Sequence, residues 1–333
     1  MRKSNYPGKG LKALPVVMAS AGLAAILFPS HSAAQTLFAS VPSAYNVYDF
    51  PGGTQDTFYT FPSSLSNEPW GLAFDQAGDL FVANNLGGFI TKFADNGGTL
   101  STTGVTFSAG MDATALAFDS AGDLFEADGA SKIREFKVSG GSLSTTSSSF
   151  ATVNGSDPMS LAFDSAGDLF VADYGTNKVS EYKSTGGVLS TSASTFGTGT
   201  NHLSGPVSMA FDSQGDLFVA SNSNNGIYEY SPSGVQTLFS NTDVSGPAGL
   251  AFDSAGDLFE ANQGTTNGQA TINEFVMQEN GTLSATPIVY ASGLNFPDSL
   301  AFQPAPVPEP DVIASLFGGL GMLVGWRRVR HRG

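Results

Sequence analysis

Carboxylates are the side chains of this sequence whose type and spacing could support chemistry. The chain has no cysteine, and His202 is the one histidine between residues 35 and 304. Thiol chemistry, disulfides, zinc sites of the usual ligand set and histidine-based hydrolytic triads therefore lack the residues that they need. His202 follows Gly199-Thr-Asn in a predicted loop, where a solvated histidine is a simpler interpretation than a catalytic one. We assign no catalytic residue from the sequence.

One repeated segment positions most of the carboxylates. Gly71-Leu-Ala-Phe-Asp-Gln-Ala-Gly-Asp-Leu-Phe-Val-Ala-Asn84 is its first copy, and Ser299-Leu-Ala-Phe302 is a truncated sixth. The copies between them are residues 115–128, 160–173, 208–221 and 249–262. Successive copies begin 41 to 50 residues apart, which is the length of a four-stranded propeller blade. We therefore predict an all-β, six-bladed β-propeller over residues 35–304.

Each copy divides into four expected strands. Leu-Ala-Phe is the first, and a tight Asp-x-x-Gly-Asp turn leads to the second. An apolar pair three residues apart marks the third, and a Ser/Thr-rich run ending in an aromatic residue marks the fourth, as in 97–107, 140–150 and 186–196. The truncated copy lacks strands two to four, and segments that match them occur at 36–40, 47–50 and 52–61. The last blade should thus combine three N-terminal strands with one C-terminal strand, which closes the ring.

The pattern Pro-x-x-Leu-Ala-Phe-Asp-x-x-Gly-Asp-Leu-Phe-Val-Ala-Asp, followed by Asn and Ile, resembles NHL-type repeats. It is also similar to the six-bladed propellers of the SMP-30/gluconolactonase group. The resemblance spans nearly all of residues 35–304 and implies the fold. It also implies a group in which Glu, Asp and Asn hold a metal in the central channel. Propellers host binding and catalysis alike, so the resemblance leaves the function open.

Three carboxylates stand at one position of the repeat, four residues before the start of Leu-Ala-Phe. They are Glu68, Asp112 and Asp157, and the remaining copies have Gly205, Gly246 and Phe296. The first strand of a propeller blade usually lines the channel, so these groups could converge at one mouth. Oxygen ligands of this kind could hold a divalent cation such as Ca²⁺. Ordinary acidic loop ends are the alternative.

Two aspartates flank the tight turn in every complete copy. The pairs are Asp75/Asp79, Asp119/Asp123, Asp164/Asp168, Asp212/Asp216 and Asp253/Asp257. A feature that recurs in every blade belongs to the architecture, so turn capping is our interpretation and calcium binding is the alternative.

Glu126 and Glu260 interrupt the repeat where other copies have Val82, Val171 and Val219. A buried glutamate would need a partner or a raised pKa. A position at an edge or facing the channel would leave it solvated, and this second case is our expectation.

Charge is distributed unevenly along the chain. Of its 14 Lys and Arg, four lie in the first 12 residues and four in the last seven. Six basic residues then face 27 acidic ones over residues 35–304, a net charge of −21. Such a surface repels nucleic acid and attracts cations and basic partners. We therefore exclude nucleic acid as a partner.

The N-terminus has the three parts of a secretory signal. Basic residues precede an apolar run over 14–28, and small residues follow Pro29. We predict a signal peptide over 1–34, with cleavage by signal peptidase after Ala34. An uncleaved anchor is the alternative, although the run is shorter than the ~20 residues that a membrane span needs.

The C-terminus has a second tripartite signal over residues 305–333. Pro308, Glu309 and Pro310 precede an apolar run over 312–326, and the chain ends with Arg327, Arg328, Arg330 and Arg332. The basic end would hold the helix transiently in the membrane with its tail in the cytoplasm. This arrangement resembles the PEP-CTERM sorting signal, which implies an exosortase-type protease and the envelope or extracellular matrix of a Gram-negative bacterium. Simple hydrophobic anchoring is the alternative.

Two functions remain open on this evidence. The first is a non-enzymatic or structural module of the envelope or matrix that binds protein or glycan through its loop faces. The Ser/Thr-rich fourth strands could contact extracellular polysaccharide, and simple solubility of the outer strands is the alternative. The second is a divalent-metal-dependent lactonase or hydrolase with Glu68, Asp112 and Asp157 at the metal.

Overall fold

A computed structural model describes residues 35–63, 67–110, 112–153, 157–198, 202–264 and 269–305. The predicted signal peptide with its cleavage site at Ala34, and the sorting motif with its arginines, lie outside the described residues. Within the described residues, no helix is both long and apolar enough to span a membrane.

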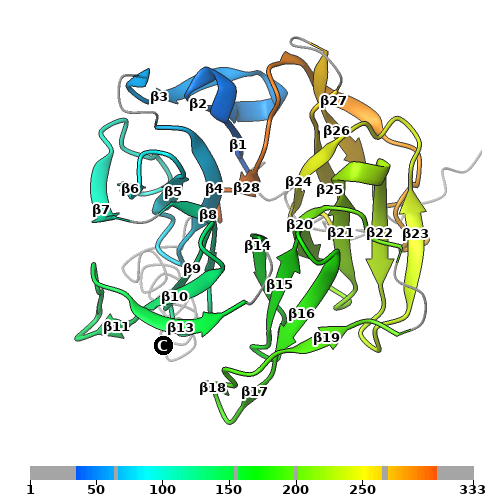
Figure 1. The fold of residues 1–333 in the computed structure, drawn as a ribbon. Helices are drawn as coiled ribbons and strands as arrows, with labels where there is room; N and C mark the ends of the chain where they lie inside the picture. The colour runs from blue at the N-terminus through cyan, green and yellow to red at the C-terminus, as the bar shows by residue number, and fades with distance from the viewer. Residues whose placement is uncertain are drawn as a thin grey trace, which may run out of the picture. The chain divides into compact units, whose positions relative to one another are not determined.

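Six four-stranded antiparallel sheets, formed by the described residues, surround a central axis (Figure 1). The innermost strands carry Leu-Ala-Phe or Met-Ala-Phe. In blades one to six they are β4 (Pro69–Phe74), β8 (Ala113–Phe118), β14 (Pro158–Phe163), β20 (Pro206–Phe211), β24 (Pro247–Phe252) and β28 (Leu300–Phe302). The second strands are β5 (Leu80–Asn84), β9 (Leu124–Asp128), β15 (Leu169–Asp173), β21 (Leu217–Ser221), β25 (Leu258–Asn262) and β1 (Leu37–Val41).

The outer half of each blade has fewer hydrophobic residues than the inner half. The third strands are β6 (Phe89–Phe93), β10 (Lys132–Phe136), β16 (Lys178–Tyr182), β22 (Gly226–Tyr230), β26 (Ala270–Phe275) and β2 (Asn46–Phe50). The fourth strands are β7 (Val105–Ala109), β13 (Ser148–Thr152), β19 (Ser194–Phe196), β23 (Gln236–Ser240), β27 (Ile288–Leu294) and β3 (Asp56–Thr60). Short 3₁₀ turns occur at η1 (Pro42–Ala44), η2 (Pro51–Gly53) and η4 (Asn222–Asn224).

The ring closes through blade six as predicted. Strand β1 pairs antiparallel with β28, in a register that places Leu37 opposite Phe302 and Ala39 opposite Leu300. The backbone of Ser40 extends this pairing: its N–H donates to Ser299 O at 3.0 Å, and its carbonyl accepts from Asp298 N at 2.9 Å. The two ends of the propeller thus share one sheet.

The fourth strands differ from their prediction. The expected strand over 97–107 begins only at Val105, and the glycines before it form a turn with Gly97 and Gly98 at φ of 72° and 90°. In blades two and three the same region forms small hairpins, β11 (Val138–Ser139) with β12 (Ser142–Leu143) and β17 (Ser184–Thr185) with β18 (Val188–Leu189). Paired glycines permit the positive φ that these turns need, so the chain folds back before the outer strand starts.

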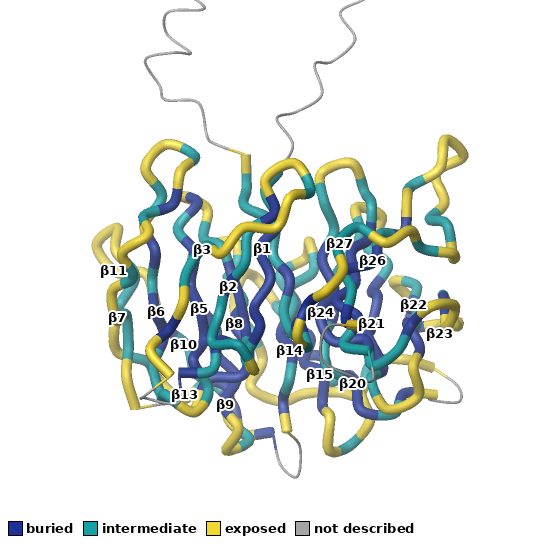
Figure 2. The backbone as a smooth tube through the Cα atoms, turned by 90° about the horizontal axis from the view of Figure 1, so that it is seen from above, coloured by how far each residue is buried: buried dark blue, intermediate teal, exposed yellow. Residues whose placement is uncertain are grey.

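The core lies between neighbouring blades. Phe81 on β5 contacts Phe107 of its own blade edge-on at 5.2 Å and Phe118 of blade two at 5.1 Å. Equivalent phenylalanine triads recur around the ring, and such T-shaped pairs stabilise an interface beyond their buried area. Figure 2 shows burial concentrated on the inner strands and exposure on loops and outer strands. Packing of this kind holds the inner strands in fixed positions around the channel.

The turn-capping interpretation of the paired aspartates is confirmed. Asp75 Oδ1 accepts hydrogen bonds from the N–H groups of Ala77 and Asp79, both at 2.9 Å. Asp79 Oδ1 in turn accepts from Asp95 N at the end of strand three, at 2.6 Å. The other complete blades repeat the first of these caps. The first aspartate therefore shapes the turn, and the second ties it to the next strand.

Candidate functional site

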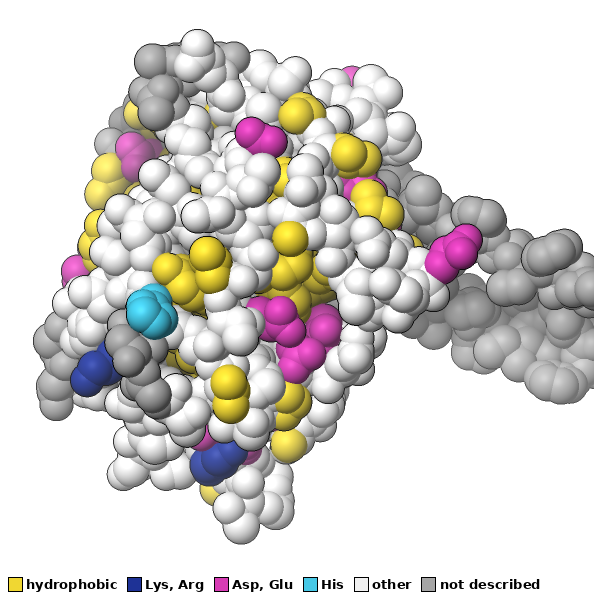
Figure 3. Space-filling view, turned by 90° about the vertical axis from the view of Figure 1, so that its right-hand side faces the viewer, with side chains coloured by type: hydrophobic (Ala, Val, Ile, Leu, Met, Phe, Trp, Pro, Cys, Tyr) yellow, Lys and Arg dark blue, Asp and Glu magenta, His cyan; other side chains and the backbone are white. Residues whose placement is uncertain are grey.

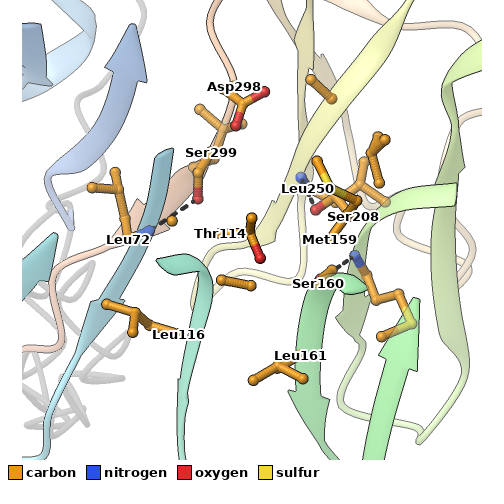
Figure 4. A pocket seen from close by; sticks show the side chains of 16 residues that line it. Leu72, Thr114, Leu116, Met159, Ser160, Leu161, Ser208, Leu250, Asp298 and Ser299 are labelled. Atoms are coloured by element: carbon orange, nitrogen blue, oxygen red, sulfur yellow. Dashed lines mark hydrogen bonds between the residues drawn. The ribbon is translucent and has the colours of Figure 1, made fainter. Parts of the chain in front are cut away.

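The central channel contains a cavity of about 100 Å³. All six innermost strands line it, because the residues at the start of each Leu-Ala-Phe segment point toward the axis of the ring. Figure 4 shows the lining side chains. Apolar side chains alternate around it with serine and threonine hydroxyls.

Serine hydroxyls in the channel join adjacent blades. Ser160 Oγ accepts a hydrogen bond from Met209 N at 3.1 Å, and Ser208 Oγ accepts one from Leu250 N at 3.0 Å. Ser299 Oγ accepts one from Leu72 N at 3.3 Å, across the closure of the ring (Figure 4). Each bond joins a strand N–H of one blade to the hydroxyl of the blade before it. These hydroxyls therefore fix the spacing of the blades around the cavity.

Glycine occupies the serine position where blades approach more closely. A Cβ on Gly249 would lie 2.6 Å from the carbonyl oxygen of Asp298, and one on Gly71 would lie 2.9 Å from that of Thr114. Both distances are below any ordinary carbon contact, so these positions need glycine. Thr114 itself donates to Pro158 O at 2.8 Å, which ties blade two to blade three.

Asp298 is the one ionisable side chain among the described residues that line the cavity. It is partly exposed to the channel and stands two residues before Leu300. Gln263 Nε2 approaches its Oδ1 at 3.4 Å, and none of the described residues donates to its Oδ2. Burial raises the pKa of the Asp298 carboxyl to about 6, with no charged neighbour contributing. At neutral pH this group is a largely ionised carboxylate in a confined space.

Asp298 was not predicted from the sequence, because it stands at a different position of the repeat from the three predicted acids. The three predicted acids stand four residues before the leucine, whereas the channel is lined from two residues before it. At that position the other blades have Trp70, Thr114, Met159, Val207 and Ala248. An acid at this one place in the six copies was the available signal.

The predicted metal ligands lie at loop ends just outside the innermost strands. Their backbone carbonyls accept hydrogen bonds from Asn85, Gly129 and Tyr174 of the neighbouring hairpins. Asp112 and Asp157 are exposed, and Glu68 is half-buried. In the part of the chain that is described, no group of three or more Asp, Glu or His side chains is placed to hold a metal. A cation at Glu68, Asp112 and Asp157 stays a prediction.

The expectation that Glu126 and Glu260 are solvated is wrong. Both side chains are fully buried, at 0 % exposure. They lie on the same strand faces as Leu124 and Leu258, since alternate residues of a strand share a face. Leu124 packs against Phe81 of blade one, and Leu258 packs against Phe218 of blade four. The two glutamates therefore occupy the hydrophobic seams between blades.

The two buried carboxylates have different surroundings. Glu126 lies opposite Arg134, whose Nε is 3.7 Å from Oε2. Burial and then Asp128 raise the pKa of Glu126 to about 7, while Arg134 lowers it. Glu260 Oε2 accepts a hydrogen bond from Asn273 Nδ2 at 2.8 Å, and its Oε1 has no partner among the described residues. Burial raises its pKa to about 8.

Basic residues compensate the acidic turns on one half of the ring only. Lys92 bonds Asp79 in blade one at 2.5 Å, and Lys183 bonds Asp168 in blade three at 2.9 Å. Residues 184–305 contain no Lys or Arg. Accordingly, burial and the adjacent turn aspartates raise the pKa values of Glu229 in blade four and Glu274 in blade five. Figure 3, which views the side where these blades lie, shows acidic side chains gathered on that face.

His202 is exposed, as expected. Its ring is parallel to that of Tyr228, with centroids 6.5 Å apart. Its backbone N–H donates to Gln236 Oε1 at 3.1 Å, and its carbonyl accepts from Asn224 Nδ2 at 2.8 Å. The contacts hold the loop against blade four, away from the channel lining.

Comparison with known proteins places the chain in a fold class. No family model matches the sequence, and no curated protein matches it. The structure is similar to virginiamycin B lyase from Staphylococcus aureus, at 16% identity and a TM-score of 0.55, over 78% of this chain and 86% of that one. It is also similar to a chain of the nidogen/laminin complex, at 15% identity and a TM-score of 0.61, over 82% and 99%. At this identity the likeness shows the fold alone: the chain is a six-bladed β-propeller.

Proposed function

We propose that this chain is an exported bacterial propeller of the cell envelope or extracellular matrix that binds a protein or glycan at the mouth of its central channel, without catalysing a reaction. The observation that carries the proposal is the cavity itself. All six blades contribute to its lining. Blade six places the carboxylate of Asp298 there, at a position where the other five blades have no acid. Concave sites with a few convergent polar groups are the usual form of ligand pockets.

The role of the channel hydroxyls supports binding over catalysis. A nucleophilic serine needs a base within hydrogen-bond reach to activate it. Ser160, Ser208 and Ser299 instead receive backbone N–H groups from the next blade. Their orientation is thus determined by the closure of the ring, which gives the cavity a constant shape for recognition.

Export is proposed from the two ends of the sequence. The basic and apolar segments of residues 1–34 would engage signal peptidase, with cleavage after Ala34. The Pro308-Glu309-Pro310 motif and the arginine-rich end would engage an exosortase-type protease after transient insertion of the apolar helix in the membrane. The acidic body fits an extracellular ligand that is cationic or neutral.

A channel-filling variant tests the binding site. Val207 lines the cavity on β20, and Val207→Phe should fill it. Thr237→Phe adds the same ring on the exposed face of the outer strand β23 and is the matched control. With envelope material of the source organism, Val207→Phe should abolish retention and Thr237→Phe should leave it intact. The reverse pattern would move the site to the Ser/Thr-rich outer strands and refute the proposal.

A further inference from the structure

The size and lining of the channel cavity limit what can enter it. About 100 Å³ holds a few waters or one slender chain and is small for a hexose ring. Leucine side chains surround it at Leu72, Leu116, Leu161, Leu250 and Leu300. These leucines are nearly buried in the hydrophobic seams between blades, so hydroxyl groups and backbone contribute much of the open lining. The small volume therefore limits an occupant to a stem of one-chain width.

The polar end of such an occupant is defined by Asp298. Its carboxylate faces the cavity with one weak contact, from Gln263 at 3.4 Å. The serines beside it already accept hydrogen bonds from the backbone but keep their own O–H donors. No Lys or Arg occurs in residues 184–305, and none of the described residues that line the cavity is basic. The site thus offers a carboxylate that lacks a cation.

The charge of the whole propeller favours the same kind of occupant. Residues 35–304 have a net charge of −21. A field of this sign concentrates cations near the surface and speeds their association. Because Asp298 is partly buried, an ion pair with its carboxylate is less screened by water than the same pair at the open surface.

Taken with the proposed function, on which this step rests, we propose that the channel binds the side chain of a lysine presented by a partner protein, with Asp298 as the anchor for its ammonium group. Lysine combines a slender four-carbon stem with a compact point charge. Arginine is less suitable, because its planar guanidinium prefers a bidentate partner. An amino sugar carries the same charge on a ring that the cavity is too small to hold.

Titration with n-butylammonium chloride tests this assignment on the purified protein. The probe reproduces the stem and head of lysine, and n-butanol is its uncharged control. Amide and methyl shifts of the channel residues in NMR spectra should report saturable binding of n-butylammonium and little binding of n-butanol. Equal binding of the two probes would overturn the role of the charge.

Two variants localise the effect. Asp298→Asn should weaken n-butylammonium binding by about 10- to 100-fold, the range expected for a charge-assisted hydrogen bond. Asp56→Asn removes one exposed charge from the outer strand β3 and should change the affinity less than twofold. If Asp298→Asn has a lower melting temperature than the native protein, Asp298→Ser replaces it in this binding measurement. Unchanged affinity in a folded Asp298 variant would refute the proposal.

The pH dependence of binding gives a second readout. Because the Asp298 carboxyl has a pKa of about 6 in the free protein, n-butylammonium should bind roughly tenfold more weakly at pH 5 than at pH 7.5. A flat profile would contradict an anchoring role for Asp298.

The proposed function and this assignment can fail separately. Retention of envelope material that is lost in Val207→Phe but kept in Asp298→Asn would retain the channel as a site and refute the lysine. Retention of a glycan instead of a protein would likewise keep the channel as the binding site and refute the lysine. Loss in Asp298→Asn together with competition by n-butylammonium supports both.

Discussion

Glu260 makes the stability of this propeller depend on pH in a direction that can be calculated. The carboxyl is fully buried between blades four and five, with Oε2 bonded to Asn273 and Oε1 unpartnered in the described residues. Burial raises its pKa from the ordinary 4.5 to about 8 in the folded protein. Between these two values the folded state holds a proton that the unfolded chain has released.

The sign and size of the effect follow from proton linkage. The contribution to the free energy of unfolding is fully present below pH 4.5 and is lost as the pH rises toward 8. The slope in this window is about 1.4 kcal/mol per pH unit. From pH 5 to pH 8 the wild-type protein should therefore lose on the order of 3 to 4 kcal/mol relative to a variant without the ionisable group.

Glu260→Gln is the variant for this measurement, since the amide keeps the shape and an oxygen to accept from Asn273. Urea unfolding at pH 5, 6, 7 and 8 should show the variant gaining on the wild type with each step. Glu279→Gln, an exposed position of the same blade, is the matched control and should show no such trend. A difference between Glu260→Gln and wild type that is constant from pH 5 to pH 8 would refute the reasoning.

Other predictions follow from the same contacts. Glu126→Gln should show the trend over a narrower window that ends near pH 7, because Arg134 lowers the pKa of Glu126; urea unfolding over the same pH range checks it. Gly249→Ala should cost roughly 1 to 3 kcal/mol of stability by forcing blades five and six apart, whereas Gly129→Ala, where a Cβ meets no atom within 4 Å and φ is not positive, should cost less. Ser208→Ala should cost about 1 to 2 kcal/mol by leaving Leu250 N–H without its acceptor. EDTA should leave the melting temperature unchanged if Glu68, Asp112 and Asp157 are ordinary loop ends; a stoichiometric metal whose removal lowers it would support the lactonase hypothesis instead.

The repeat made the fold predictable because each copy contains the same residues that determine its local structure. Asp75, Gly78 and Asp79 specify one turn, and the spacing of the copies sets the number of blades. The truncation after Phe302 predicted the closure, since a single strand cannot leave a sheet edge exposed without cost. These features depend on contacts within a copy or on chain length.

Features that depend on contacts between copies were not predictable in the same way. Whether the position of Glu126 faces water or the next blade depends on how tightly adjacent sheets stack. Adjacent sheets pack tightly enough to bury this position, so the glutamates that stand in place of valine are not exposed to solvent. The position of Asp298 at the cavity likewise depends on how the innermost strands of all six blades come together. The late start of the outer strands depends on turns at paired glycines such as Gly140 and Gly141.

Site-specific photocrosslinking tests the central claim, that the ligand lies at the channel mouth, most directly. A photoreactive phenylalanine at Met159, which lines the cavity opposite blade six, would be compared with one at Thr237 on the outer strand, in cells of the source organism. The account predicts a discrete adduct from position 159, lost with Asp298→Asn, and none from position 237. Adducts from position 237 alone would contradict it.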